Sequence, residues 1–280
     1  MLTLVVCTLG RTTQLERLLR SLKTQTDTRF QVLVVDQNPA GYLDEALAAG
    51  AGLALTRIKS PPGVSRARNI GLQQVTTPLV AFPDDDCWYP PGLVADVIAR
   101  FDKDPATAVL TGRTVDAMLR ESVSPHLGHS QPLSRRSAFH AGNTSAFFAR
   151  TEAVRSVGGF DETLGVGAST IFGSGEETEF LLKCLKHGLQ VRYERDLLVH
   201  HDQVVRDEAK VASYAVGFGR VCRMHALGGY LAPRLARAAL KSMALLATGD
   251  AVAARTRWRW IRGSLHGYFT EPLRRDVRSQ

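Results

Sequence analysis

The first hundred residues alternate short apolar runs with segments in which apolar residues recur every three or four positions. The runs at 2–7 and 31–35 are rich in valine and leucine, which is typical of buried strands. Residues 12–24, between them, carry four leucines at helical spacing. The same alternation predicts strands at 2–7, 31–35, 53–58 and 79–82 and helices at 12–24, 43–49, 65–74 and 91–101. Repeated strand–helix–strand units predict an α/β fold whose mostly parallel, doubly wound sheet has helices on both faces.

From residue 108 onward the periodicity is weaker. Residues 120–140 are rich in Ser, Pro, His and Arg and predict a long loop, and long loops in compact domains are often functional. The remaining expected strands are 108–113, 146–150, 191–193 and 197–200, with helices at 151–157 and 176–187. Two or three basic amphipathic helices are expected at about 208–227, 231–248 and 250–265. We therefore predict one domain over residues 1–205 and a basic helical extension over residues 206–280.

The positive charge of the chain is concentrated in that extension. The net charge is +8, and residues 206–280 hold 14 Lys and Arg against 5 Asp and Glu. Such a segment suits an anionic membrane, a nucleic acid or an anionic acceptor, and solvated helix faces explain it equally well. Because apolar stripes and two tryptophans accompany the arginines, peripheral contact with an anionic membrane is the favoured interpretation, and packing against the first domain or a second subunit is the alternative.

Cysteine usage and the apolar profile indicate the compartment. Cys7, Cys87, Cys184 and Cys222 have no CxxC spacing, which predicts a reducing compartment and no zinc site. A basic segment followed by a long apolar stretch is absent from the N-terminus, and no window holds about 18 uninterrupted apolar residues. We expect neither a signal peptide nor a transmembrane helix, and we predict a cytoplasmic protein, including the cytoplasmic face of the membrane as a location.

Three consecutive carboxylates, Asp84, Asp85 and Asp86, follow the apolar run that ends at Phe82. They are expected at the carboxyl end of a strand, where ligands bind in open α/β sheets. Adjacent carboxylates repel each other unless a cation neutralises them, and hard oxygen ligands suit Mg²⁺ or Mn²⁺, which also hold substrate phosphates. The sequence predicts a metal-dependent enzyme that acts on a diphosphate. An acidic turn or helix N-terminus is the simpler explanation, because Asp favours both.

Other polar residues follow the remaining strands. Thr8 and Arg11 come after the first strand and Asp36 after the second, so these side chains are expected to converge on one crevice. Arg66 and Arg68 begin the helix after the third strand, where cationic groups beside a helix N-terminus suit a diphosphate. A turn would also explain Asp36, and a solvated helix face would explain the two arginines.

Two common nucleotide-binding classes are disfavoured. No GxGxxG follows the first strand, which argues against an NAD or FAD dehydrogenase. No GxxxxGK[ST] is present, which argues against a P-loop NTPase.

The order of several motifs resembles a known family. Four segments are similar to the nucleotide-sugar-binding half of family 2 glycosyltransferases: Val5-Val6-Cys7-Thr8 with Arg11, Val34-Val35-Asp36, residues 63–71 and residues 82–86. Three later segments resemble the acceptor half in the same order: Gly142-Asn143, residues 158–162 and residues 175–180. The resemblance covers about residues 1–205, with the nucleotide-sugar half at 1–115 and the acceptor half at 116–205.

The resemblance implies a fold, a reaction and its partners. It implies the GT-A fold, a nucleotide-diphosphate-sugar donor, most often UDP-linked, and inversion at the anomeric carbon. A divalent cofactor, Mn²⁺ or Mg²⁺, and a glycan or lipid-linked acceptor belong to the same expectation. Inverting transfer uses a carboxylate as general base and needs no covalent intermediate.

The resemblance also implies residue roles, carried over by position. Thr8, Arg11 and Asp36 would surround the nucleoside, and Arg66, Arg68 and Asn69 would shape the donor site. Asp84 and Asp86 match the family's DxD motif and are both candidate metal ligands, with Asp86 the expected direct ligand and Asp84 or Asp85 contacting ribose or sugar. His200 or His201 lies where some members place a histidine that reaches the metal or the diphosphate. The pair Glu176-Glu177 occupies the place of the family's catalytic base, and Glu177 is the expected base with Glu176 as the alternative.

Three competing interpretations stay open. A nucleotidyltransferase acting on a sugar phosphate also uses a doubly wound sheet, but residues 9–13 are a poor version of its Lys-bearing phosphate loop. A nucleic-acid-binding protein would use the basic extension but leaves the acidic cluster unexplained, so no nucleic-acid partner is expected. A binding module that has lost catalysis is the third, and a homodimer is compatible with all of them.

Overall fold

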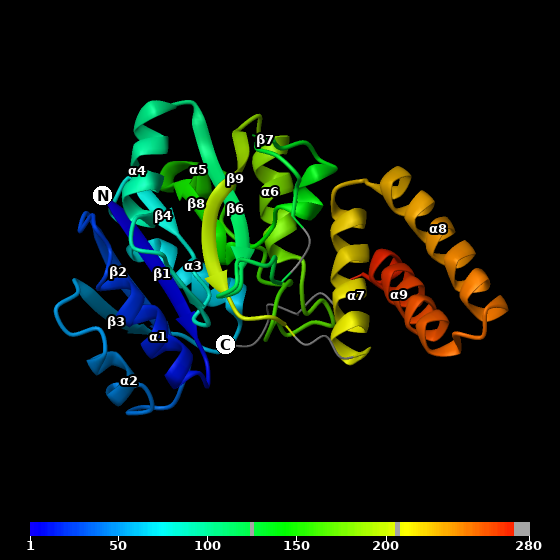
Figure 1. Ribbon diagram of the computed structural model, residues 1–280, viewed down its shortest axis with the longest axis horizontal. Helices are drawn as coiled ribbons and strands as arrows, with labels where there is room; N and C mark the ends of the chain where they lie inside the picture. Colours follow the sequence, from blue (N-terminus) through cyan, green and yellow to red (C-terminus); the bar gives the residue numbers. More distant parts are fainter. Residues whose placement is uncertain (124–125, 205–207, 272–280) are drawn as a thin grey trace, which may run out of the picture. The chain divides into compact units, whose positions relative to one another are not determined.

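Strands from the first two hundred residues assemble into one sheet. The computed structural model describes residues 1–123, 126–204 and 208–271, and within them the sheet has nine strands in the order β3-β2-β1-β4-β8-β6-β9-β5, with β7 also paired to β9 (Figure 1). The chain divides into two compact units. The sheet unit contains residues 1–160 and 177–204, and the helical unit contains residues 161–176 and 205–280.

The elements of the sheet unit lie close to the predicted ranges. The strands are β1 (Leu2–Thr8), β2 (Phe30–Asp36), β3 (Leu55–Lys59), β4 (Leu79–Ala81), β5 (Cys87–Trp88), β6 (Thr107–Val115), β7 (Gln131–Pro132), β8 (Phe147–Arg150) and β9 (Gln190–His201). The helices are α1 (Thr12–Leu22), α2 (Asp44–Ala48), α3 (Val64–Gln74), α4 (Leu93–Lys103), α5 (Thr151–Ser156) and α6 (Glu176–Lys186). The short strands β5 and β7 were not expected, because two residues carry no periodicity.

The sheet is parallel where the strand–helix alternation is regular. β1 pairs in parallel with β2 and β4, and β2 pairs in parallel with β3, so that Thr8 lies opposite Asp36 at the carboxyl ends. β8 runs antiparallel between β4 and β6, a reversal that the apolar pattern does not reveal. β9 is one strand across both segments expected at 191–193 and 197–200, and its register with β6 shifts between Thr111 and Arg113.

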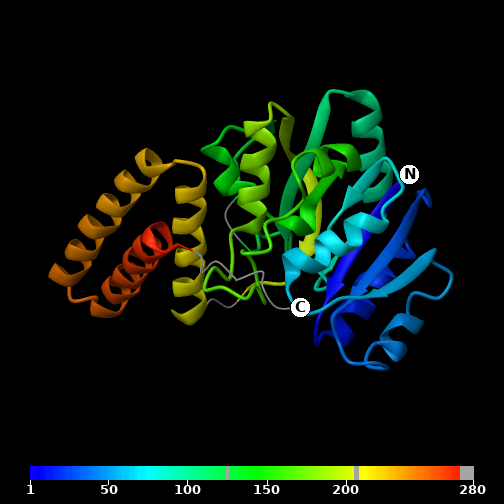
Figure 2. The same ribbon diagram turned by 180° about the vertical axis from the view of Figure 1, so that it is seen from behind.

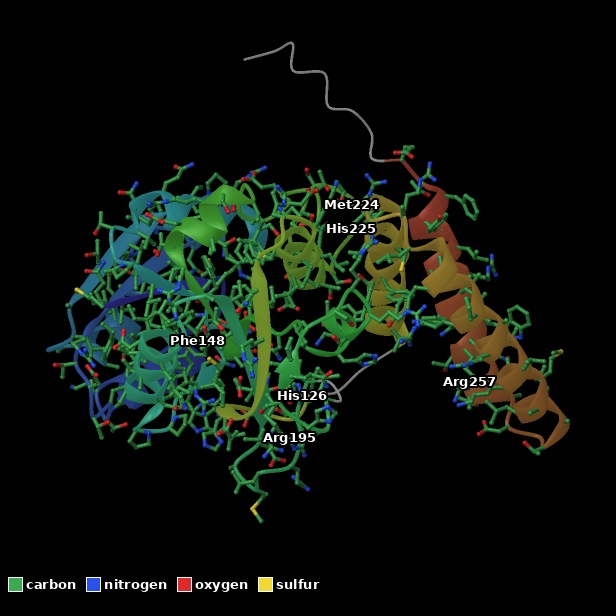
Figure 3. The ribbon with its side chains drawn as sticks, turned by 90° about the horizontal axis from the view of Figure 1, so that it is seen from above. His126, Phe148, Arg195, Met224, His225 and Arg257 are labelled. Carbon is green, nitrogen blue, oxygen red and sulfur yellow. The ribbon has the colours of Figure 1, made fainter. Side chains whose placement is uncertain are left out.

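Helices cover both faces of the sheet. On one face, apolar side chains of α1 and α4 pack around Phe148 of β8 in the main hydrophobic core (Figure 3). On the other face, α3 lies so close to β1 that a Cβ at Gly71 would overlap the side chain of Val5. Phe180 of α6 packs edge-on against Phe147 of β8 on this second face, which Figure 2 shows from the opposite side to Figure 1. Successive strand residues point to opposite faces, which explains the different partners of Phe147 and Phe148.

The helical unit confirms the predicted C-terminal helices. They are α7 (Glu208–Met224), α8 (Gly228–Ala247) and α9 (Ala251–Phe269). α7 and α9 meet through small residues: a Cβ at Gly219 would overlap the carbonyl of Ser264, and a Cβ at Gly267 would overlap the carbonyl of Val216. Backbone therefore packs on backbone along this contact. Within the described residues, none of the helices is both long and apolar enough to cross a membrane.

Substitution at this contact tests the packing. Gly267→Ala should lower the free energy of unfolding of the helical unit by about 1 kcal/mol, because overpacking costs about 1–3 kcal/mol and the gain in helix propensity offsets about 1 kcal/mol of it. Urea unfolding followed by circular dichroism measures the change. Gly229→Ala is the control, since a Cβ there meets nothing within 4 Å. Equal stability of the two variants would show that α7 and α9 are not in backbone contact.

Candidate functional site

The three aspartates lie where β4 ends, in the turn that leads to β5. Asp84 forms an isolated parallel bridge with Cys7, so the turn continues alongside the end of β1. Asp85 is buried, and Asp84 and Asp86 are half-buried. This placement confirms that the acidic run follows a strand at the carboxyl edge of the sheet, where the ends of β1 and β2 also lie.

Arg11 neutralises two of the three carboxylates. Its Nη1 donates to Asp85 Oδ1 at 2.9 Å and also contacts Asp86 Oδ2. Burial raises the pKa of Asp85 to about 6, although the Arg11 charge acts in the opposite direction. Arg11, between β1 and α1, and the turn after β4 therefore attract each other electrostatically, as their common sheet edge predicts.

Asp86 also pairs with His201, the last residue of β9. His201 Nε2 lies 3.1 Å from Asp86 Oδ1. Burial by itself would lower the pKa of His201, but the hydrogen bond with Asp86 outweighs it and raises that pKa. Burial likewise acts to raise the pKa of Asp86, and the hydrogen bond with His201 outweighs it, so that pKa is lowered. Of the two candidate histidines, His201 contacts the acidic cluster.

The neighbouring His200 belongs to an aromatic stack. Its ring lies parallel to the Trp88 ring, with centroids 5.1 Å apart. The guanidinium of Arg17 from α1 lies 4.0 Å from the centroid of the Trp88 ring. Arg17 Nη2 also donates to the backbone carbonyl of Asp86 at 2.8 Å, and Arg17 Nη1 donates to Asp202 at 2.8 Å. Arg17 thus joins the turn that carries Asp86 to the end of the strand that carries His201.

Asp84 is held from the opposite side by the turn before β8. Ser145 Oγ donates to Asp84 Oδ2 at 2.7 Å, and Thr144 Oγ1 lies 3.2 Å from Asp84 Oδ1. Arg68 of α3 is buried and donates to Asp84 Oδ1 at 3.1 Å and to Thr144 Oγ1 at 2.7 Å. Each carboxylate of the acidic run therefore has a cationic partner.

The same threonine connects the cluster to the start of α6. The backbone N–H of Thr144 donates to Glu177 Oε1 at 3.1 Å, and the Thr144 hydroxyl lies 2.9 Å from the same oxygen. Glu177 Oε1 and Asp84 Oδ1 thus both lie within hydrogen-bonding distance of the single Thr144 hydroxyl. Glu176, the preceding residue, is buried and falls in the helical unit.

Asp36 forms a second polar centre at the end of β2. Arg57 Nε and Lys59 Nζ donate to Asp36 Oδ2 at 2.8 and 2.7 Å, and Asn38 donates twice to Oδ1. Burial by itself would raise the pKa of Asp36, but the hydrogen bonds from Lys59 and Asn38 outweigh it and lower that pKa to about 2. Asn38 also accepts from the Gly10 N–H at 2.6 Å, which links this centre to the segment before Arg11.

Two predicted donor-site residues contribute differently from Arg68. Asn69 exchanges two hydrogen bonds with the backbone of Phe160, each of 2.9 Å. The centroid of the Phe160 ring lies 5.2 Å from the Arg68 guanidinium. Asn69 therefore contacts the acidic cluster indirectly, through Phe160 and Arg68. Arg66 lies half-buried on the first turn of α3, and Thr8 is buried at the end of β1.

The four predicted metal ligands do not form one cluster. Asp86 and His201 are paired, whereas Asp84 is bonded to Ser145 and Arg68, and His200 stacks on Trp88. In the part of the chain that the structure describes, no three His, Cys, Asp or Glu side chains are arranged to hold a metal ion. An oxygen and a nitrogen donor nevertheless stand side by side in the Asp86–His201 pair.

Sequence reasoning missed the residues that support the cluster. Thr144 and Ser145 directly follow the Gly142-Asn143 motif, and that position was the only signal for them. Arg57 and Lys59 are two residues apart on β3, so both side chains lie on the same side of the strand and point toward Asp36. A sequence-based prediction of the pairing register between β2 and β3 would have placed them there. Arg17 lies on the polar side of the α1 stripe and looks like an ordinary solvated arginine.

Comparison with known proteins gives these contacts a family context. Residues 3–162, more than half of the chain, match the family described as Glycosyl transferase family 2. The pre-mycofactocin glycosyltransferase of Mycobacterium tuberculosis is 28% identical over 264 residues. That match covers 90% of this chain and 51% of the relative, so the chain spans about half the length of the curated relatives it matches.

Solved structures share the fold at low sequence identity. The mannosyltransferase PcManGT from Pyrobaculum calidifontis, in complex with GDP-Man and Mn²⁺, has a TM-score of 0.67 and 18% identity, covering 96% of this chain and 87% of that one. S. aureus TarS 1-349 in complex with UDP-GlcNAc has a TM-score of 0.61 and 14% identity, covering 95% and 90%. These similarities confirm the predicted α/β fold of the GT-A type with a C-terminal helical region.

The Asp36 centre makes a prediction about acid stability. Its pKa is about 2 in the folded chain and about 3.9 when unfolded, so the ionised form stabilises the fold above pH 4 and this contribution is lost as the pH falls toward 2. The difference in free energy of unfolding between wild type and Asp36→Asn should therefore narrow by about 2 kcal/mol between pH 5 and pH 2. Urea unfolding at a series of pH values measures it.

A neutral substitution on the same strand provides the control. Val34→Ala removes a buried apolar side chain from β2, and its difference from wild type should stay constant over this pH range. A constant difference for Asp36→Asn as well would mean that the ionised carboxylate does not stabilise the fold.

Proposed function

The chain belongs to glycosyl transferase family 2, and on this basis we propose that it transfers a sugar from a nucleotide-diphosphate sugar to a hydroxyl group of a glycan or lipid-linked acceptor. One observation carries the proposal. Asp84 of the acidic run and Glu177 at the start of α6 both lie within hydrogen-bonding distance of the Thr144 hydroxyl, so the proposed donor-binding residues and the proposed base are adjacent within the sheet unit.

The donor is proposed to bind along the carboxyl edge of the sheet. Asp36 and Thr8 are the candidates for contacts with the nucleoside, and Arg11 and Arg68 lie beside the carboxylates where a diphosphate needs cationic partners. TarS is described in complexes with UDP and UDP-GlcNAc and PcManGT in a complex with GDP-Man. We propose a UDP-sugar as the first candidate donor.

The residues present fit a divalent metal ion bound together with the donor. Asp86 offers carboxylate oxygen and His201 offers imidazole nitrogen 3.1 Å away, and Mn²⁺ accepts both kinds of ligand. Ions of this class use one or two protein ligands and complete their coordination with substrate phosphates and water. Asp86 and His201 would hold the ion, which would stabilise the negative charge of the departing diphosphate.

Glu177 is proposed as the general base. Direct displacement requires the acceptor hydroxyl to attack C1 of the sugar from the side opposite the diphosphate, which inverts the anomeric configuration. A carboxylate takes the hydroxyl proton as the C–O bond forms, and help of this kind is worth about 10²–10⁴ in rate. Both hydrogen bonds from Thr144 fall on Oε1 of Glu177 and orient the carboxylate. Glu176 remains the alternative base.

Nucleotide binding tests the donor site. A thermal-shift panel of UDP, GDP, dTDP and CDP, each with and without Mn²⁺ or Mg²⁺, should show a metal-dependent rise in Tm with one nucleotide. Saturation at a hundredfold excess over Kd stabilises the fold by about 2.7 kcal/mol. Asp86→Ala should abolish the metal-dependent part of the shift, because it removes the proposed oxygen ligand.

Asp102→Ala, at an exposed aspartate on α4, is the matched control and should keep the full shift. No shift with any nucleotide–metal pair on the wild-type protein would count against the transferase proposal as a whole. A shift that is unchanged in Asp86→Ala would remove only this residue from the metal site.

A second prediction concerns the base. Glu177→Gln should reduce transfer by about 10²–10⁴-fold, because the amide cannot accept the proton, while the Kd for the nucleotide changes little. Transfer measured with the donor identified by the panel, beside nucleotide binding by calorimetry, separates the two effects. Glu152→Gln, an exposed position on α5, serves as the control and should retain activity. Loss of transfer in Glu176→Gln but not in Glu177→Gln would assign the role to the other residue.

A further inference from the structure

The hairpin formed by α8 and α9 carries an excess of positive charge. Residues 228–269 contain seven Lys and Arg but one acidic residue, Asp250. The Asp250 carboxylate accepts a hydrogen bond from the Ala253 N–H at 3.0 Å and caps the N-terminus of α9. The hairpin therefore has a formal net charge of +6, and a positive potential extends from it into solvent.

The exposed side of α8 is apolar. Leu231, Ala238 and Ser242 are buried, whereas Leu240 and Met243 are 63% and 52% exposed on the opposite side of the helix. Arg237 and Lys241 are exposed beside this apolar stripe. An apolar helix face that the described residues leave in solvent, with cations along its border, is the pattern of a helix that lies at a membrane surface.

The exposed side of α9 mixes arginines with large apolar side chains. Arg255, Trp258, Arg262, Leu265 and Phe269 recur every three or four residues, share one face and are all exposed. Gly263 and Gly267 lie on the side that packs against α7, so this face is not used to hold the unit together. Figure 3 labels Arg257, another exposed arginine of α9. Trp and Arg side by side are favoured where an apolar layer meets charged headgroups.

We propose that the exposed surface of the α8–α9 hairpin binds peripherally to an anionic lipid bilayer. Charge complementarity selects this occupant, because six of the seven cations are exposed and a cation near an anionic surface contributes about 1 kcal/mol. The exposed apolar side chains then enter the headgroup region, which a nucleic acid does not offer. A second copy of the chain on this surface would oppose like charges, which disfavours a homodimer through the hairpin. The proposal does not depend on the transfer reaction.

Vesicle binding by the full chain tests the proposal. Co-sedimentation should show strong binding to vesicles of 30% phosphatidylglycerol in phosphatidylcholine, weak binding to pure phosphatidylcholine, and a decrease with rising salt. Arg255→Gln with Arg262→Gln should lower the partition coefficient by about 30-fold, since each charge near the surface contributes about fivefold. Arg20→Gln with Lys23→Gln, two exposed cations at the end of α1, is the matched control and should bind as the wild type does.

Quenching of tryptophan fluorescence measures the insertion of Trp258 into the bilayer. Brominated lipids should quench part of the tryptophan fluorescence in the wild type, and Trp258→Phe should remove most of that quenching while most of the vesicle binding remains. Circular dichroism and thermal unfolding of every variant confirm that the helices are intact.

Three results would overturn the proposal. The first is equal binding to anionic and neutral vesicles. The second is that the wild type binds duplex DNA but not vesicles, and that the Arg255→Gln, Arg262→Gln variant loses the DNA binding. This result would make the hairpin a nucleic-acid-binding surface. The third is a dimer in light scattering that Leu240→Ser separates into monomers, which would assign the apolar stripe to a second copy of the chain.

Discussion

Neutralisation of three adjacent carboxylates is the constraint on which the site depends. Asp84, Asp85 and Asp86 cannot be held together at a sheet edge without counter-charges, because their mutual repulsion acts in a partly buried setting. The structure supplies a different partner for each side of the run: Arg11 from the end of β1, Arg68 from α3 and His201 from the end of β9. Elements far apart in sequence are thus drawn to one point by charge, and the parallel sheet brings their ends to the same edge.

Elements with many periodic residues were predictable from the sequence. The leucines of α1 and the apolar runs of β1 and β2 determine both type and position, since each repeats one signal over seven or more residues. β5 has two residues and forms only because Trp88 and Cys87 pair with the end of β9. The direction of β8 depends on its neighbours β4 and β6, which no local pattern encodes.

The residues of the candidate site also divide into those that the sequence could place and those that it could not. The aspartates, Arg11 and Arg68 could be placed from sequence because they flank predicted strands and helices. The choice between His200 and His201 could not, since successive strand residues face opposite sides and the choice depends on register with Trp88 and Cys87. Thr144 gave no signal by itself, because a threonine in a turn is commonplace. Its importance comes from lying within reach of Asp84 and Glu177 at once.

The contact between α7 and α9 has a consequence for how the helical unit can change over evolution. Helix rotation is counted in steps of about 100° per residue, and only one angular setting of α9 brings Gly263 and Gly267 against the α7 backbone. A slip by one residue would place His266 or Tyr268 at the position of Gly267, where even a Cβ does not fit. The glycines, which lack a Cβ, therefore fix the direction in which the arginine-bearing face of α9 points. Substitutions among the exposed residues can change the charge of that face without changing its direction.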